Sequence, residues 1–264
     1  MIEINQLCVT FNSGTPLENP VLRGIDLTIP AGQFLTVIGG NGAGKSTLLN
    51  ALAGEAAISS GTVLLDQQDV TRWGVSQRAH WVARVFQDPL AGTCAELTVE
   101  ENLALAAARN RSRGLRRALS QTARAEFRER LAQLGLGLEY RLEDRMNLLS
   151  GGQRQAVSLL MATLRPTKIL LLDEHTAALD PKTAAFVLEL TRNIVAGQHL
   201  TALMVTHGLR QALDLGERTV MLHQGRVVFD ISGPERTRLD VPDLLRLFEE
   251  SQGEAVSDDK LLLG

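Results

Sequence analysis

Short apolar runs alternate with helical patterns along most of the chain. Apolar runs bounded by turn residues predict buried strands at 32–40, 83–87, 168–174 and 200–207. Apolar residues at helical spacing predict helices at 45–54, 151–164 and 181–197. Strands that alternate with helices are typical of a mainly parallel sheet with both faces covered, so the pattern predicts an α/β fold.

Two regions break this alternation. The first 30 residues and the stretch 218–230 have the pattern of antiparallel hairpins, which predicts an antiparallel β subdomain at the edge of the core. Between Asp88 and about Leu164 the strand signals stop and helical patterns take over. We therefore expect an inserted α-helical subdomain in this part of the chain.

The arrangement predicts one domain over 1–250, which a chain of 264 residues is long enough to form. Its core is expected in 1–87 and 165–250, with the helical subdomain in 88–164. The remaining stretch, 251–264, is expected to be a loosely ordered tail.

Composition narrows the choice of partners. The net charge of -3 gives no overall basic footprint, so nucleic acid is not expected as a partner. Cys8 and Cys94 lie far apart without metal-ligand spacing, which fits a reducing compartment better than a disulfide scaffold. The first residues lack the apolar core of a signal peptide, and no window reaches the roughly 18 apolar residues of a membrane span. Work at a membrane would therefore depend on another chain.

One segment of the helical region is strongly basic. Residues 109–130 hold eight arginines against two glutamates. Charge runs of this kind usually form a solvated helix face. The alternative is a surface that faces anionic headgroups or the loops of a partner.

A glycine-rich segment at 39–47, GGNGAGKST, follows the first predicted strand and opens a helix. This context predicts a phosphate-binding loop, in which backbone N–H groups surround phosphate oxygens at a helix start. Lys45 is expected to reach the β and γ phosphates of a nucleotide, and the Ser46 hydroxyl to join the shell of a Mg²⁺ ion. The residues expected to bind the nucleotide here are Gly39, Asn41, Gly42, Ala43, Gly44, Lys45, Ser46 and Thr47.

Two adjacent carboxylates end the apolar run of the strand at 168–174. A phosphate site with Mg²⁺ needs a carboxylate for the metal and, for hydrolysis, a base that orients water. We expect Asp173 to hold the metal and Glu174 to polarise the attacking water. Because adjacent side chains on a strand point to opposite faces, the chain must already turn at Glu174 if both are to serve one site.

A second helix start, in the sequence LLSGGQRQ at 148–155, carries two glycines. Ser150 and Gln153 have the spacing of a capping box, and this alone would explain both residues. Gly151 and Gly152 need another reason, because glycine in a helix costs about 1 kcal/mol relative to alanine. Bare N–H groups beside the Ser150 hydroxyl would form a second anion site.

The chain resembles the ATP-binding subunits of ABC transporters over roughly residues 1–240. The resemblance rests on motifs that occur in the family's order, at 39–47, 85–89, 148–155, 169–180 and 205–207. It implies a P-loop NTPase fold, ATP and Mg²⁺ as cofactors, and ATP hydrolysis as the activity. It also implies a head-to-tail homodimer with two ATP molecules in its interface. In that dimer, the signature residues Ser150, Gly151, Gly152 and Gln153 contact the γ-phosphate of the ATP held by the opposite subunit.

The resemblance assigns roles to four further residues. Gln87 matches the residue whose amide contacts the metal and water, and His207 matches the histidine that contacts the γ-phosphate and steadies Glu174. Asp180 matches the residue that crosses the dimer interface. Phe11 matches the aromatic side chain that stacks on adenine, and a plain core phenylalanine is the alternative. The expected catalytic residues are thus Glu174, His207 and Gln87, and the expected metal ligands are Ser46, Gln87 and Asp173.

One position departs from the family. Most relatives have proline after the catalytic glutamate, where this chain has His175. Because Glu174 and His207 already supply the expected chemistry, we expect His175 to have a local structural role. A modulating role at the dimer interface is the alternative.

The function implied is that of the ATPase subunit that drives a separate membrane permease from the cytoplasmic face of the inner membrane. Soluble ABC ATPases of DNA repair carry a long coiled coil between the glycine loop and the signature, and Lys45 and Ser150 are too close in sequence for one. Translation-associated relatives carry two ATPase domains, whereas one set of motifs is present here.

The cargo is not encoded in the motifs. The stretches 84–93 and 173–184 are similar to a bacterial group of importer ATPases that are often labelled for aromatic amino acids and work with a substrate-binding protein. We therefore expect the import of a small solute such as an amino acid, with export as the alternative.

Overall fold

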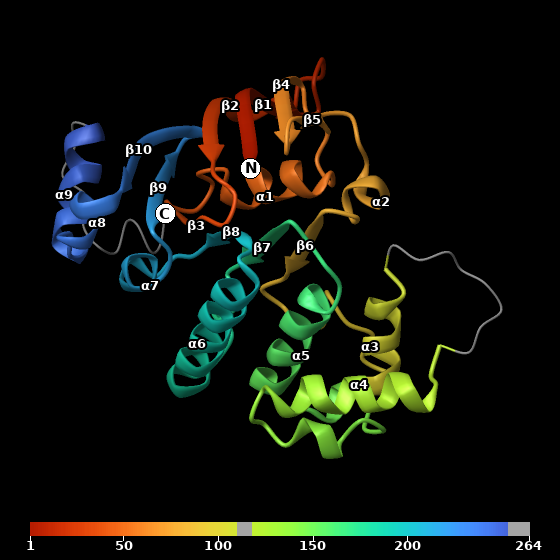
Figure 1. Cartoon of the computed structure of the whole chain (residues 1–264). Helices are drawn as coiled ribbons and strands as arrows, with labels where there is room; N and C mark the ends of the chain where they lie inside the picture. The colour runs from red at the N-terminus through yellow and green to blue at the C-terminus, as the bar shows by residue number, and fades with distance from the viewer. Residues whose placement is uncertain (110–117, 253–264) are drawn as a thin grey trace. The chain divides into compact units, whose positions relative to one another are not determined.

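The computed structural model describes residues 1–109 and 118–252, which form two compact units. The core unit holds Met1–Arg78 and the described residues from His199 onward, and the helical unit holds the described residues of Ala79–Gln198. Figure 1 shows the elements of both. Each expected strand and helix is confirmed, whereas the expected limits of the core at 87, 164 and 250 remain predictions.

An antiparallel sheet forms one layer of the core unit. β1 (Ile2–Phe11) pairs antiparallel with β2 (Asn19–Ile29) on one side and β4 (Ser60–Leu65) on the other, and the short β5 (Gln68–Asp69) pairs with β4. Alternate residues of β1 are buried, with a register shift after Ile4. The expected antiparallel edge is thus confirmed, and β4 and β5 extend it.

A mainly parallel arrangement forms the second layer of the core unit. β3 (Phe34–Ile38) is parallel to β8 (Thr201–Val205) on one side and to β9 (Arg218–His223) on the other. β10 (Arg226–Ser232) pairs antiparallel with β9. Every residue of β3 and β8 is buried, as expected for strands that are covered on both faces.

The helices of the core unit are short, except for the last. They are α1 (Lys45–Ala53), α2 (Val75–Arg78), α7 (Leu209–Asp214), α8 (Gly233–Thr237) and α9 (Val241–Gln252). α9 continues two residues into the stretch expected to be a tail, and 253–264 lie outside the described residues. Among the described residues, no helix combines the length and the apolar character that crossing a bilayer requires.

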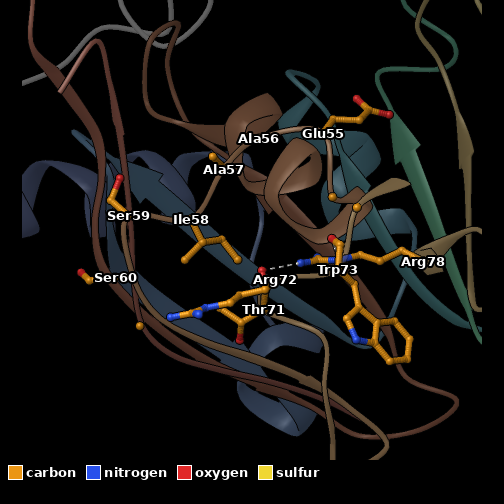
Figure 2. Close-up of a pocket in the computed structure, with 13 residues that line it drawn as sticks. Glu55, Ala56, Ala57, Ile58, Ser59, Ser60, Thr71, Arg72, Trp73 and Arg78 are labelled. Atoms are coloured by element: carbon orange, nitrogen blue, oxygen red, sulfur yellow. Dashed lines mark hydrogen bonds between the residues drawn. The ribbon is translucent and has the colours of Figure 1, made fainter. Parts of the chain in front are cut away.

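A buried arginine closes the end of α1. Arg78 donates from Nη1 to the carbonyl oxygen of Leu52 at 2.9 Å and from Nη2 to that of Val70 at 2.7 Å. Burial lowers the pKa of Arg78 to about 10, so the guanidinium stays charged at neutral pH. Figure 2 shows Arg78 beside Trp73 in the wall of a pocket of about 520 Å³. Because helix ends leave carbonyl groups unpaired, this guanidinium satisfies the Leu52 carbonyl at the end of α1 and adds a second donor to Val70 O, which also accepts from Trp73 N.

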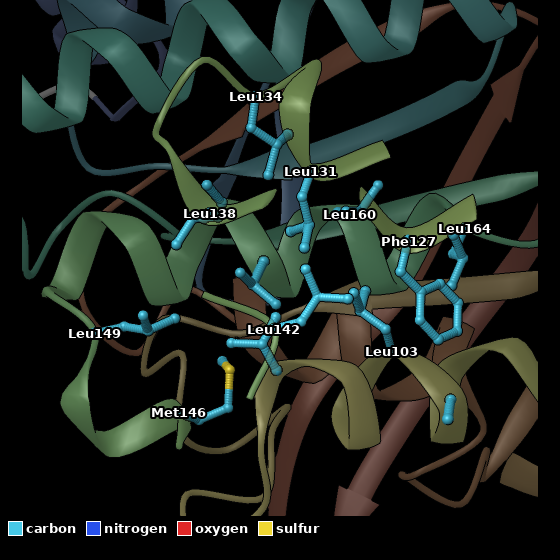
Figure 3. Packing of buried hydrophobic residues seen from close by; sticks show 14 residues of the cluster. Leu103, Phe127, Leu131, Leu134, Leu138, Leu142, Met146, Leu149, Leu160 and Leu164 are labelled. Carbon is cyan, nitrogen blue, oxygen red and sulfur yellow. The ribbon is translucent and has the colours of Figure 1, made fainter. Parts of the chain in front are cut away.

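The described part of the helical unit holds two parallel strands and four α-helices of nine or more residues. β6 (Val82–Val85) is parallel to β7 (Ile169–Asp173), with Val85 opposite Leu172. The helices are α3 (Val99–Ala107), α4 (Gln121–Ala132), α5 (Gly151–Thr163) and α6 (Pro181–Gln198), with short 3₁₀ turns η1 (Leu138–Tyr140) and η2 (Met146–Leu148). Figure 3 shows the apolar cluster on which α3, α4 and α5 pack, with Phe127 and Met146 among its fully buried side chains.

Part of the basic segment lies on α4. Arg124 pairs with Glu100 at 2.7 Å, and Arg128 and Arg130 are exposed. Exposed arginines fit both a solvated helix face and a surface that faces a partner, so the choice between the two stays a prediction. Residues 110–117 of the segment lie outside the described residues.

Candidate functional site

The glycine loop, residues 39–44, joins the end of β3 to the start of α1. Gly39, Gly42 and Gly44 have φ angles of 147°, 74° and 101°, which side-chain-bearing residues rarely adopt. A Cβ atom on Gly39 would lie 2.2 Å from the carbonyl oxygen of Leu222, and one on Gly44 would lie 2.8 Å from Leu22 Cδ2. The loop is therefore built from glycines because both the backbone conformation and the surrounding atoms require them.

Lys45 occupies the inside of this loop. Its Nζ donates to the carbonyl oxygens of Gly39 at 2.7 Å and Gly40 at 2.9 Å, and the residue is 5% exposed. No side chain caps the start of α1 at Gly44. A buried ammonium beside an uncapped helix start is an arrangement that attracts an anion.

The other loop residues differ in exposure. Asn41 and Ser46 are exposed, Thr47 is half-buried and Ala43 is buried. The Ser46 hydroxyl is thus accessible beside Lys45, whereas Ala43 offers its backbone alone. Ala43 O accepts a hydrogen bond from Gly225 N at 3.1 Å, which fixes the loop to the turn between β9 and β10.

His207 lies at the same edge of the core unit as the glycine loop. Val37 of β3 pairs with Val205 of β8, and Thr206 N donates to Val37 O at 3.2 Å. The two parallel strands thus end at the same level, and Gly39 and His207 both lie just after their carboxyl ends. His207 is half-buried.

Phe11 ends β1 with 42% of its surface exposed. The alternative of a core phenylalanine is therefore wrong. An exposed ring is free to stack on a planar ligand, so the expected adenine contact stays a prediction.

The helical unit carries the two carboxylates at the end of β7. Because Leu172 pairs with Val85, Asp173 at the end of β7 and Gln87 just after β6 lie at the same edge. Glu174 has a φ of 45°, which is the turn that two adjacent carboxylates need in order to serve one site. Gln87 is exposed and Glu174 is half-buried.

Asp173 is paired with an arginine that the sequence interpretation missed. Arg84 Nη2 lies 2.6 Å from Asp173 Oδ2, and the side chains are 10% and 13% exposed. Arg84 also stacks on Phe86, with its Cζ 4.7 Å from the ring centroid. The sequence did hold a sign of this pair, because Arg84 puts a charge in the predicted buried strand at 83–87 and a buried charge needs a partner.

The signature segment begins α5 with a complete capping box. Gln153 N donates to Ser150 Oγ at 3.3 Å, and Ser150 N donates to Gln153 Oε1 at 3.1 Å. Arg141 Nη1 donates to the same Gln153 oxygen at 3.2 Å. This network fixes the amide of Gln153 and leaves Ser150 on the surface.

Gly152 has a packing reason that the sequence interpretation did not include. A Cβ atom there would lie 2.1 Å from Thr183 Cγ2 in the first turn of α6. At Gly151 the nearest atom would be Leu179 Cδ2 at 3.4 Å, an ordinary contact. The second glycine therefore lets α5 approach α6, while the first is free for the expected ligand role.

Asp180 caps the start of α6. Thr183 N donates to Asp180 Oδ1 at 3.1 Å, and hydrogen bonds with Thr183 lower the pKa of the carboxyl group. The residue is exposed, so a contact across a dimer interface stays a prediction.

His175 is a buried part of the packing of α6. It is 1% exposed, and its Nε2 lies 2.9 Å from Thr191 Oγ1. Thr191 donates its single hydroxyl proton to Val187 O at 2.8 Å, so Nε2 must be the donor to Thr191. Burial lowers the pKa of His175 to about 4, which makes it neutral at physiological pH. The structural role expected for His175 is confirmed.

The residue types of the three expected metal ligands fit a hard divalent cation. Ser46, Gln87 and Asp173 offer hydroxyl, amide and carboxylate oxygens, which are the ligand types that Mg²⁺ prefers. Ser46 belongs to the core unit, and Gln87 and Asp173 to the helical unit.

Comparisons with known proteins decide the family. The family model described as ABC transporter matches residues 22–177. A tyrosine transport ATP-binding protein of Clostridioides difficile (strain R20291) is 43% identical over 249 residues, which cover 94% of this chain and 99% of the relative. The chain belongs to the ABC transporter family. The thiamine import ATP-binding protein ThiQ of Yersinia pseudotuberculosis serotype I (strain IP32953) is 37% identical over 81% of this chain and 85% of its own length.

A solved structure of the same family supports the fold and the activity. The ATP-binding cassette MJ0796, in a dimeric post-hydrolysis state with ADP and Pi, superposes with a TM-score of 0.76 at 27% identity. The match covers 88% of this chain and 98% of that one. The fold is that of a P-loop NTPase with an antiparallel β part and a helical part, and the protein is an ATP-binding ATPase of its family.

Proposed function

We propose that the protein is the ATP-hydrolysing subunit of a transporter that imports a small solute such as an amino acid. The observation that carries this proposal is the 43% identity with a tyrosine transport ATP-binding protein over nearly the full length of both chains. The second relative is named as a thiamine import protein, which favours import over export. Amino acids, with the aromatic ones first, are the solute class that the stronger likeness favours.

We infer that the nucleotide binds through the glycine loop, with Lys45 on the β and γ phosphates and the Phe11 ring on adenine. The loop's glycine-dependent shape and the buried ammonium support this assignment. Ser46, Gln87 and Asp173 would supply the oxygens that hold Mg²⁺, which neutralises phosphate charge when bound. Glu174 orients the attacking water, and His207 contacts the γ-phosphate and steadies Glu174.

The working unit is proposed to be a head-to-tail homodimer around two ATP molecules. Support comes from the solved cassette MJ0796, which is described as dimeric, and from the exposure of Ser150 and Asp180. Ser150, Gly151, Gly152 and Gln153 would contact the ATP held by the opposite subunit. Each helix start with accessible N–H groups can complement phosphate charge.

The partners are proposed to be integral membrane permease subunits at the cytoplasmic face of the inner membrane and, through them, a substrate-binding protein. The likeness to the ATP-binding proteins of a tyrosine transport system and a thiamine import system supports this placement. Nucleic acid is not proposed as a partner, because the net charge is -3.

The test is reconstitution of the chain with the permease and binding protein encoded beside its gene. ATP hydrolysis in proteoliposomes should rise several-fold when the binding protein is loaded with tyrosine, phenylalanine or tryptophan. Labelled solute should accumulate on the side of the membrane that carries the ATPase, opposite the substrate-binding protein. Stimulation by thiamine and by none of the amino acids would indicate that the solute resembles that of the thiamine import relative. If ATP is hydrolysed but no loaded binding protein stimulates hydrolysis or gives uptake, the importer proposal is overturned and only the ATPase activity stands.

A further inference from the structure

The ion pair of Arg84 and Asp173 lies where the proposed metal ligands gather. Arg84 pairs with Leu171 in the register of β6 and β7, so Arg84 and Asp173 point to the same face of the two strands. This places the guanidinium beside the carboxylate, at 2.6 Å between Nη2 and Oδ2. The pair is one residue from Glu174 and three from Gln87.

The guanidinium contacts the carboxylate directly. Nη2 of Arg84 donates to Oδ2 of Asp173. With 13% of its side chain exposed, Asp173 has little water around it, so the arginine decides which way the carboxylate points.

The same guanidinium holds the segment that carries Gln87. Its Cζ lies 4.7 Å from the centroid of the Phe86 ring. The Phe86 carbonyl oxygen accepts a hydrogen bond from Gln155 Nε2 of α5 at 3.3 Å. Phe86 is therefore fixed from both sides, and Arg84 connects the end of β7 to the residue that precedes Gln87.

We propose that Arg84 is a positioning residue that holds Asp173 through Oδ2 and Phe86 by its ring, and so presets Asp173 and Gln87 for a divalent cation. This inference rests on the proposed nucleotide site. Partners behind a metal ligand of this kind typically set metal affinity by ten- to hundredfold. Only an arginine can provide both the hydrogen bond and the planar stack, since lysine is a point charge.

The test measures metal binding separately from turnover. Binding of Mn²⁺ to the full chain with a non-hydrolysable ATP analogue is followed by electron paramagnetic resonance. Affinity for a fluorescent ATP analogue is measured in EDTA. The Arg84→Met variant should bind Mn²⁺ about ten- to hundredfold more weakly than the wild type, with its metal-free nucleotide affinity unchanged. Arg84→Lys should lie between the two.

Arg124→Met is the matched control, because Arg124 makes a similar pair with Glu100 on α3, at 2.7 Å. It should keep the wild-type affinity for Mn²⁺. A folded Arg84→Met variant with wild-type or tighter Mn²⁺ binding would overturn the inference. If Arg84→Met does not fold, wild-type Mn²⁺ affinity in Arg84→Lys overturns it instead. Failure of the wild type to bind Mn²⁺ with the nucleotide would overturn the proposed nucleotide site itself. The wild-type Mn²⁺ titration separates this result from a failure of the Arg84 inference.

Discussion

The Nε2 atom of His175 lies 2.9 Å from the hydroxyl oxygen of Thr191, in a place where the imidazole is 1% exposed. Thr191 donates its own hydroxyl hydrogen to Val187 O, so Nε2 of the histidine is the donor to Thr191, and burial keeps the ring neutral at physiological pH. The residue that replaces the family's usual proline is thus a structural tie between the end of β7 and α6.

This tie predicts a loss of stability in mild acid. Burial lowers the pKa of His175 to about 4 from the ordinary 6.5. Between these pH values His175 is protonated in the unfolded chain but not in the folded chain. Its contribution to the free energy of unfolding is therefore fully present above about pH 6.5 and is lost as the pH falls toward 4. The full contribution is about 3 kcal/mol.

The measurement is chemical unfolding of the wild type and of His175→Gln from pH 7 to pH 4. Glutamine keeps a donor for Thr191 and does not titrate, so the wild type should lose about 3 kcal/mol more than the variant over this range. Parallel losses in the two proteins would show that His175 is protonated in the fold.

Gly152→Ala should destabilise the protein by about 1–3 kcal/mol, because the new methyl group would meet Thr183 Cγ2 at 2.1 Å. Thr183→Ser removes that methyl group, so the double variant should regain most of the loss. Gly151→Ala is the control, and it should be unchanged or gain up to about 1 kcal/mol. Equal free energies of unfolding for the two alanine variants would contradict the packing account.

Arg78→Met should cost about 1–3 kcal/mol, because it removes the guanidinium that donates to the buried carbonyl oxygen of Leu52, whereas Val70 O keeps a second donor in Trp73 N. Arg72 lines the same pocket but is exposed, so Arg72→Met should change the free energy of unfolding by less than about 0.5 kcal/mol. Thermal and urea unfolding compare the two. A small effect at both positions would mean that water replaces the Arg78 guanidinium.

Lys45→Ala should weaken ATP binding by at least about tenfold, because a charge-assisted hydrogen bond contributes about 1.5–3 kcal/mol. It should also abolish turnover. Titration with a fluorescent ATP analogue checks the affinity, and the exposed Lys182→Ala variant serves as the control. If Lys45→Ala binds the ATP analogue with unchanged affinity, Lys45 does not contact the phosphates as proposed.

The sequence predicted the elements that have one dominant pattern. The apolar runs of β3, β7 and β8 and the glycine loop were readable because buried strands and φ-positive glycines allow few alternatives. The turn at Glu174 followed from side-chain alternation alone. The exposure of Phe11 needed the structure, since a terminal strand residue can face either way.

What the sequence did not show depends on contacts between distant residues. Gly152 was interpreted through its ligand role because Thr183 is remote in sequence and meets it only when α5 packs on α6. Arg84 and Asp173 lie on different strands, and their pairing needs the register of β6 and β7. The charge in a buried strand was the available hint.

The central claim is that two copies of the chain enclose ATP and hydrolyse it. Glu174→Gln removes the residue proposed to orient water and keeps the residues proposed to bind ATP. Light scattering coupled to gel filtration should show this variant as a monomer without nucleotide and as a stable dimer in saturating ATP. A Glu174→Gln variant that binds ATP and stays monomeric at saturation would contradict the account.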